Sequence, residues 1–144
     1  MIVPERVSLI TLAARNVAAL RTFYQQLGWR ETDFSSDYYA VYTTAGVMLT
    51  LYPIEDWEKD VGLTVRKNTG EYKPISISIN VQEASEVDGI FHHLQAIGGD
   101  ILQLPASGDN GGRSFYFADP ELHVWEVTYN PTATFDDRGA MLTL

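Results

Sequence analysis

The sequence contains no cysteine among its 144 residues, which excludes disulfide bonds, thiolate nucleophiles and cysteine metal sites. It also has no apolar run close to the roughly 20 residues that a membrane-spanning helix needs. Its first residues, MIVPERVSLI, lack a basic segment followed by a long apolar stretch, so no signal peptide is expected. These absences favour a cytoplasmic protein with no membrane partner.

Positive charge is scarce: 10 Lys and Arg stand against 19 Asp and Glu, for a net charge of -9. Such a chain repels phosphates, so nucleic acid is not expected as a partner. A solvated acidic surface is the simplest interpretation, and a cationic small-molecule ligand is compatible with it. With 45% hydrophobic and 20% charged residues, the composition is typical of a globular domain.

The first half of the chain predicts a strand, a helix and two further strands. VSLITLAA (7–14) is an apolar strand candidate, and Asn16 is a candidate N-cap for a helix that Gly28 ends. YYAVYTTAGVMLTLYP (38–53) indicates two strands around a turn. The segment that follows, 54–72, is charged and weakly patterned, but Ile54, Trp57 and Val61 have the spacing of a short helix or lid.

The second half predicts the same order of elements. ISISINV (75–81) alternates strictly, as a strand with two different faces does. A helix is expected to begin at Ser85, with Asp88 completing a variant of the capping box, and to end at Gly98. A strand at 100–105 and a hairpin over 113–129, with its turn at Asp119-Pro120, complete this half.

Each half therefore has a strand, a helix and then two or three strands, and this repeated order predicts an α+β fold made of two tandem βαβββ modules, at about 5–53 and 73–131. The linker 54–72 joins the modules and the tail 132–144 follows them, within one domain spanning 1–144. Each sheet has one face left after its helix is packed. The modules are therefore expected to form a curved mixed sheet around a cleft.

Two stretches, VSLITLAARNVAALRTFYQQLGW and GGRSFYFADPELHVWEVTYNP, resemble the vicinal oxygen chelate superfamily. That superfamily includes glyoxalase I, extradiol dioxygenases, fosfomycin-inactivating thiol transferases and bleomycin-binding resistance proteins. The resemblance covers residues 7 to about 131 and implies the same fold. One departure is Leu122, where the family often has glycine in the turn.

The resemblance places metal ligands on the first and last strand of each module. These positions carry Leu9, Thr50, Ser76 and Glu126, of which only Glu126 is a good ligand for a divalent transition ion. No metal and no other cofactor is therefore expected. His123 is at an odd spacing from Glu126, so the two side chains should point to opposite faces, and His123 is interpreted as a residue of the hairpin.

Period-two alternation defines the side chains that should face the cleft. The predicted ligand-binding residues, which include Trp57 from the linker, are Thr11, Met48, Thr50, Tyr52, Trp57, Ser76, Ser78, Asn80 and Glu126. Aromatic residues available for stacking are Trp57, Tyr52 and Tyr42. The alternative is that the Ser76, Ser78 and Asn80 row faces water on an open sheet.

Three functions are compatible with the sequence. The first is a metal-free, homodimeric protein that binds a cationic or aromatic small molecule, like the bleomycin-resistance branch. The second is a metal-independent lyase or isomerase in which Glu126 is the catalytic acid or base. The third, a metal-dependent glyoxalase or dioxygenase, is disfavoured by Leu9, Thr50 and Ser76.

Overall fold

The computed structural model describes residues 3–65 and 72–144, and the chain divides into two compact units, Met1–Val65 and Arg66–Leu144. The first unit contains, in order, β1 (Leu9–Ala14), α1 (Val17–Gln26), β2 (Ala40–Thr43), β3 (Met48–Pro53) and α2 (Ile54–Val61). The second unit contains β4 (Ser76–Val81), α3 (Ala84–Ala96), β5 (Asp100–Ser107), β6 (Arg113–Ala118), β7 (Val124–Tyr129), β8 (Thr134–Phe135) and β9 (Met141–Thr143).

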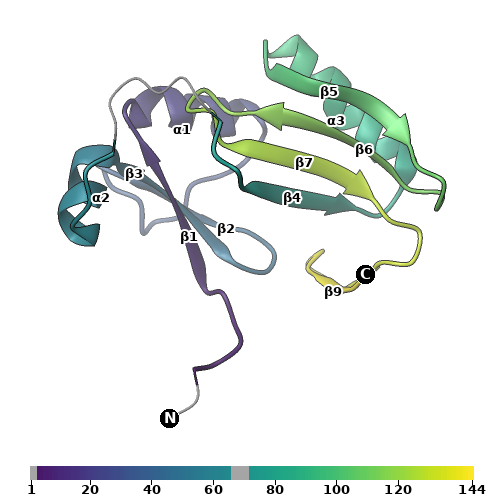
Figure 1. The fold of residues 1–144 in the computed structure, drawn as a ribbon, viewed down its shortest axis with the longest axis horizontal. Helices are drawn as coiled ribbons and strands as arrows, with labels where there is room; N and C mark the ends of the chain where they lie inside the picture. The colour runs from purple at the N-terminus through teal and green to yellow at the C-terminus, as the bar shows by residue number, and fades with distance from the viewer. Residues whose placement is uncertain (1–2, 66–71) are drawn as a thin grey trace. The chain divides into compact units, whose positions relative to one another are not determined.

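The first unit is a three-stranded sheet in the order β1-β3-β2. Strand β3 runs parallel to β1 and antiparallel to β2. Helix α1 packs on one face of this sheet (Figure 1). Its apolar side chains Leu20, Phe23 and Tyr24 are buried, as are Leu49 and Leu51 of β3, so the hydrophobic core of this unit lies between the helix and the sheet.

Helix α1 begins where the sequence predicts it to begin. The side chain of Asn16 accepts a hydrogen bond from the backbone N–H of Ala19 at 3.0 Å. That bond satisfies one of the N–H groups that a helix start leaves without a partner. The helix ends before Gly28, whose φ of 93° suits glycine far better than any residue with a side chain. Both terminal signals in the sequence are therefore confirmed.

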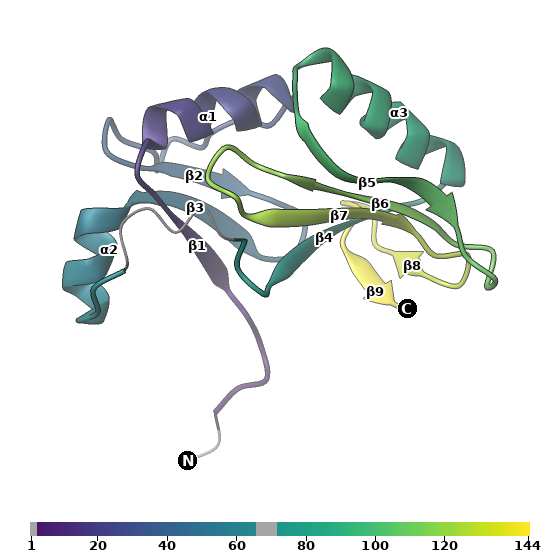
Figure 2. The same ribbon diagram turned by 45° about the horizontal axis from the view of Figure 1, so that its top comes forward.

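The second unit contains a four-stranded sheet in the order β4-β7-β6-β5, with α3 over one face (Figure 2). Strand β4 runs parallel to β7, while the other pairs are antiparallel. Phe115, Phe117, Trp125 and Val127 are buried on this sheet. The ring of Phe115 meets that of Phe91 from α3 at 5.6 Å between centroids, so aromatic packing dominates this core.

The prediction that Ser85 caps α3 is wrong. The N-cap is Glu83, whose side chain accepts from the backbone of Glu86, while the Glu86 carboxylate accepts from the N–H of Glu83 at 2.8 Å and of Gln82 at 2.9 Å. Asp88, the expected partner of Ser85, instead forms a bidentate pair with Arg113 of β6, at 2.7 and 2.8 Å. Asp88 is therefore engaged in a tertiary contact, which the local sequence pattern does not predict, and does not cap the helix.

The α+β fold class is confirmed, and both units repeat a parallel pairing of their first strand with their last sheet strand. The order βαβββ is complete in the second unit. In the first unit, an irregular segment containing Thr32 and Ser35 takes the place of one strand. Ser35 Oγ accepts from the N–H of Val41 at 2.9 Å, which occupies backbone that a neighbouring strand would use.

The linker forms α2, as the spacing of its apolar residues predicts, and residues 66–71 of the predicted linker lie outside the described residues. In the tail, β8 and β9 form a two-stranded hairpin. Within residues 3–65 and 72–144, no helix has the length and apolar character needed to cross a bilayer.

Candidate functional site

A pocket of about 430 Å³ lies on the first unit, on the face of the sheet that carries Thr11 and Thr50. Strands β1 and β3 form its floor, and α2 supplies one wall because the chain turns directly from Pro53 into that helix. Its lining side chains are mainly aromatic and apolar with one carboxylate: Leu9, Thr11, Tyr39, Thr50, Tyr52, Trp57, Asp60 and Val61.

The polar groups of this pocket are held by specific contacts. Tyr52 donates its hydroxyl to Asp60 Oδ2 at 3.0 Å, and that hydrogen bond is the main reason why the pKa of Tyr52 is raised. The rings of Tyr39 and Tyr52 lie 6.4 Å apart. The hydroxyl of Thr50 is buried and has no partner among the described residues. The pocket thus offers aromatic faces, a fixed carboxylate and one unused hydroxyl.

A polar row crosses the second unit on the face of the sheet away from α3. Ser78, Glu126 and Tyr116 lie opposite one another on β4, β7 and β6. Ser78 Oγ donates to Glu126 Oε2 at 2.9 Å. Burial raises the pKa of Tyr116, and the charge of Glu126 and a hydrogen bond to it raise that pKa further. Glu126 is therefore a carboxylate held between two hydroxyl groups.

The structure distributes the predicted site residues over the two units. The pocket of the first unit brings together four of them, Thr11, Thr50, Tyr52 and Trp57. Met48 lies on β3, as Thr50 and Tyr52 do, but it does not line the pocket. Ser76, Ser78 and Asn80 lie on β4 and Glu126 on β7. Asn80 accepts from the side-chain amide of Asn130 at 3.2 Å.

Sequence reasoning missed Asp60, Tyr39 and Tyr116. Asp60 follows Trp57 by one helical turn on α2, so the helical spacing of the linker was a usable signal. Tyr39 precedes β2, and nothing in its local pattern marks it. Tyr42, proposed as a stacking residue, is buried on the other face of the sheet, where its ring lies 5.9 Å from that of Tyr24 in α1.

The four positions to which the resemblance assigns metal ligands do not fit a transition metal. Leu9 has no donor atom, while Thr50 and Ser76 provide neutral hydroxyls and only Glu126 a carboxylate. Across residues 3–65 and 72–144, no group of three or more His, Asp or Glu side chains is arranged to hold an ion.

His123 has a structural partner in its own hairpin. Its ring Nδ1 lies 2.7 Å from Asp119 Oδ2, and both side chains are buried. Asp119 Oδ1 also accepts from the backbone N–H of Glu121 at 2.9 Å and of His123 at 3.0 Å. The contact with the Asp119 side chain holds the turn between β6 and β7, while His92 and His93 are exposed on α3.

A family model described as "Glyoxalase/Bleomycin resistance protein/Dioxygenase superfamily" matches residues 6–127. The chain belongs to this superfamily. The match covers both units and all nine predicted ligand-binding positions. A search of curated proteins found no significant match.

Solved structures of the superfamily fold superpose on most of the chain. A glyoxalase-related enzyme from Fulvimarina pelagi has 28% sequence identity and a TM-score of 0.86, covering 97% of this chain and 99% of its own. A lactoylglutathione lyase from Agrobacterium tumefaciens shares 19% identity with a TM-score of 0.68, covering 88% and 94%. The fosfomycin resistance protein FosX from Mesorhizobium loti shares 16% identity with a TM-score of 0.66, covering 89% and 94%. The last two likenesses show the fold alone.

Proposed function

We propose that this superfamily member binds a small cationic molecule without a metal, in the pocket lined by Tyr39, Tyr52, Trp57 and Asp60. The observation that carries the proposal is the combination of three aromatic side chains and one carboxylate around a single pocket. Aromatic faces attract cations through their quadrupole. A carboxylate adds a full opposite charge.

The position of Asp60 supports this proposal. Its carboxylate is oriented by the hydroxyl of Tyr52, and among residues 3–65 and 72–144 no arginine or lysine lines the pocket to neutralise it. The net charge of -9 also favours the approach of cations over anions. The volume of about 430 Å³ is within the range of small-molecule sites.

Catalysis by Glu126 is a second candidate, favoured by its contacts with Ser78 and Tyr116. A carboxylate beside a phenol that stays protonated has the composition of a general acid–base pair. In that case the chain is a metal-independent lyase or isomerase. A metal-dependent glyoxalase or dioxygenase is less favoured, because Leu9, Thr50 and Ser76 lack the donors that such chemistry uses.

Calorimetric titration with benzyltrimethylammonium and with its neutral carbon isostere tests the binding proposal. We expect the cation to bind more tightly than the isostere, and Asp60→Asn to remove about 0.5 to 1 kcal/mol of that difference, since Asp60 is exposed. Trp57→Leu should lower the affinity for the cation more than the affinity for the isostere. Asp109→Asn, which removes an exposed carboxylate elsewhere, is the matched control and should leave both affinities unchanged.

The same titration separates the two candidates. If Glu126→Gln weakens binding of the cation while Asp60→Asn does not, the carboxylate that binds the cation is Glu126, and the pocket of the first unit is not the binding site. Equal affinity of the wild-type protein for the cation and the isostere would contradict cation recognition altogether.

A further inference from the structure

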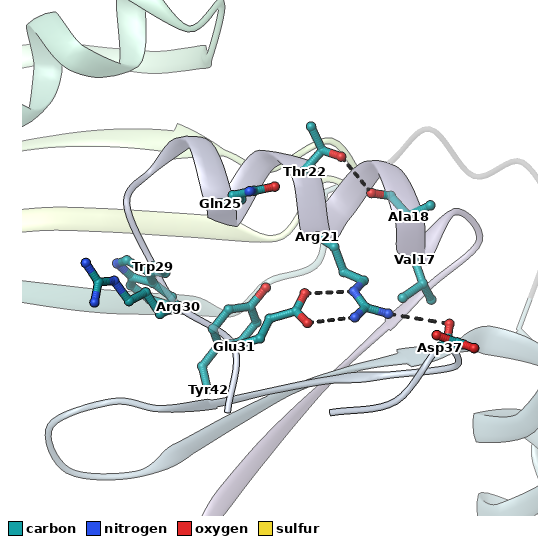
Figure 3. Close-up of a pocket in the computed structure, with 10 residues that line it drawn as sticks. All are labelled: Val17, Ala18, Arg21, Thr22, Gln25, Trp29, Arg30, Glu31, Asp37 and Tyr42. Atoms are coloured by element: carbon teal, nitrogen blue, oxygen red, sulfur yellow. Dashed lines mark hydrogen bonds and ion pairs between the residues drawn. The ribbon is translucent and has the colours of Figure 1, made fainter. Parts of the chain in front are cut away.

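A second pocket of the first unit lies on the helix side of its sheet. It has a volume of about 710 Å³ and shares no lining residue with the pocket that contains Trp57. Helix α1 forms one side and the segment that follows it forms the other (Figure 3). The lining residues include Arg21, Trp29, Arg30, Glu31, Asp37 and Tyr42.

Two of its charged side chains are bound to each other. Arg21 donates from Nε and Nη2 to the two carboxylate oxygens of Glu31, at 2.7 and 2.6 Å. Its Nη1 donates to the backbone oxygen of Ser36 at 2.8 Å. A bidentate pair of this kind has a fixed geometry. It therefore forms a rigid, electrically neutral part of the wall.

Two other charged side chains remain available at opposite ends of the pocket, Arg30 and Asp37 (Figure 3). Both residues are exposed. Among the described residues, the guanidinium of Arg30 donates to no group, and the carboxylate of Asp37 has only a through-space attraction to Arg21. The pocket thus presents one unpaired positive and one unpaired negative group, separated by the closed Arg21–Glu31 pair.

Tyr42 supplies a third unused group. Its side chain is buried, with 2% exposure, and its hydroxyl has no hydrogen-bond partner among the described residues. Burial raises the pKa of Tyr42 to about 12, with the charge of Glu31 as the next cause, so the phenol stays protonated. Glu31, which lines the same pocket, does not accept from this hydroxyl. A buried donor in this state is unfavourable until an oxygen reaches it.

We infer that this pocket binds a zwitterionic molecule of the amino-acid or short-peptide class. Arg30 pairs with the ligand carboxylate, Asp37 pairs with the ligand ammonium, and the phenol of Tyr42 donates to a ligand oxygen. A simple anion would leave Asp37 unpaired and would be repelled by the net charge of -9. A simple cation would leave Arg30 unpaired. Only a ligand with both charges matches both ends.

The test uses four probes that differ in one terminal charge or in length. These are phenylalanine, glycyl-phenylalanine, its N-acetyl derivative and its C-terminal amide, each titrated while the indole resonance of Trp29 is followed by NMR. We expect the free amino acid or the free dipeptide to bind, with the better of the two reporting the length of the ligand. Blocking either terminus of the dipeptide should weaken binding about 2- to 5-fold, as expected for partly exposed ion pairs.

Three variants assign each charge to its residue. Arg30→Gln should bind the free dipeptide and its amide equally, and Asp37→Asn should bind the free dipeptide and its N-acetyl form equally. Tyr42→Phe should lower the affinity for the free dipeptide, its amide and its N-acetyl form by the same factor. Arg6→Gln and Asp109→Asn carry the same charge changes on exposed residues outside the pocket and should leave every affinity unchanged. The inference is overturned if blocking either terminus leaves the affinity unchanged, or if no probe shifts the indole resonance of Trp29.

Discussion

At the scale of single residues, Leu122 has a backbone conformation that leucine rarely adopts. Its φ is 66°, the only positive value outside glycine in the described part of the chain. It lies in the turn between β6 and β7, where the N–H of Leu122 donates to the backbone oxygen of Asp119 at 2.9 Å. The buried contact of His123 with Asp119 holds this turn closed, so that the strain is tolerated.

Comparing glycine and alanine at position 122 should measure this strain. Both substitutions remove the same side-chain contacts, but only glycine relieves the left-handed conformation. We expect Leu122→Gly to be more stable than Leu122→Ala by about 1 kcal/mol. Urea unfolding of the two variants checks the difference. An alanine variant as stable as the glycine variant would show that the turn relaxes out of this conformation.

At the scale of elements, helix α3 begins with two glutamates that satisfy one another's backbone. Glu83 and Glu86 form the reciprocal pair described above, and the negative charges also lie at the positive end of the helix dipole. Ser85, the residue that local preference favours as a cap, lies inside the first turn of the helix instead.

Substitutions at these two positions should differ in their cost. Glu86→Ala removes the acceptor of two backbone N–H groups, and we expect a loss of about 1 kcal/mol in the free energy of unfolding. Ser85→Ala should change stability by only a few tenths of a kcal/mol, because alanine favours helix interiors. Thermal melts of both variants test this. A larger loss at Ser85 would restore the serine as the cap.

At the scale of the whole molecule, the chain is expected to form a homodimer. Strand β5 is at the edge of its sheet, and its Leu104 is 69% exposed. Ile75 and Leu142 in the same unit are also more than half exposed. Unpaired sheet edges and exposed apolar side chains are commonly covered by a second copy, and twofold association is the most frequent form of oligomer.

Sedimentation equilibrium at tens of micromolar should therefore give about twice the chain mass of 16.1 kDa. Leu104→Lys places a charge on the edge strand and should shift the equilibrium toward the monomer, whereas Val3→Lys, an exposed apolar residue near the N-terminus, should not. A wild-type chain that sediments at the monomer mass at these concentrations would contradict the dimer.

The sequence by itself determined that each half of the chain contains a strand, a helix and then further strands, although it did not predict the missing strand of the first unit or the hairpin of β8 and β9. Cap signals at Asn16 and Gly28 and strict alternation over 75–81 are local patterns, and local hydrogen bonding and side-chain periodicity suffice to predict them. The alternation also predicted that Thr11 and Thr50 share a face. They lie opposite each other in the parallel β1–β3 pair.

Only the tertiary structure decided which polar groups meet. Asp88 pairs with Arg113 instead of capping α3. Asp60 accepts a hydrogen bond from Tyr52, and Glu31 accepts one from Arg21. The partners of each pair come from different elements or from segments many residues apart. Their meeting depends on how helices and strands pack, and a pattern with a period of two or 3.6 residues carries no information about that.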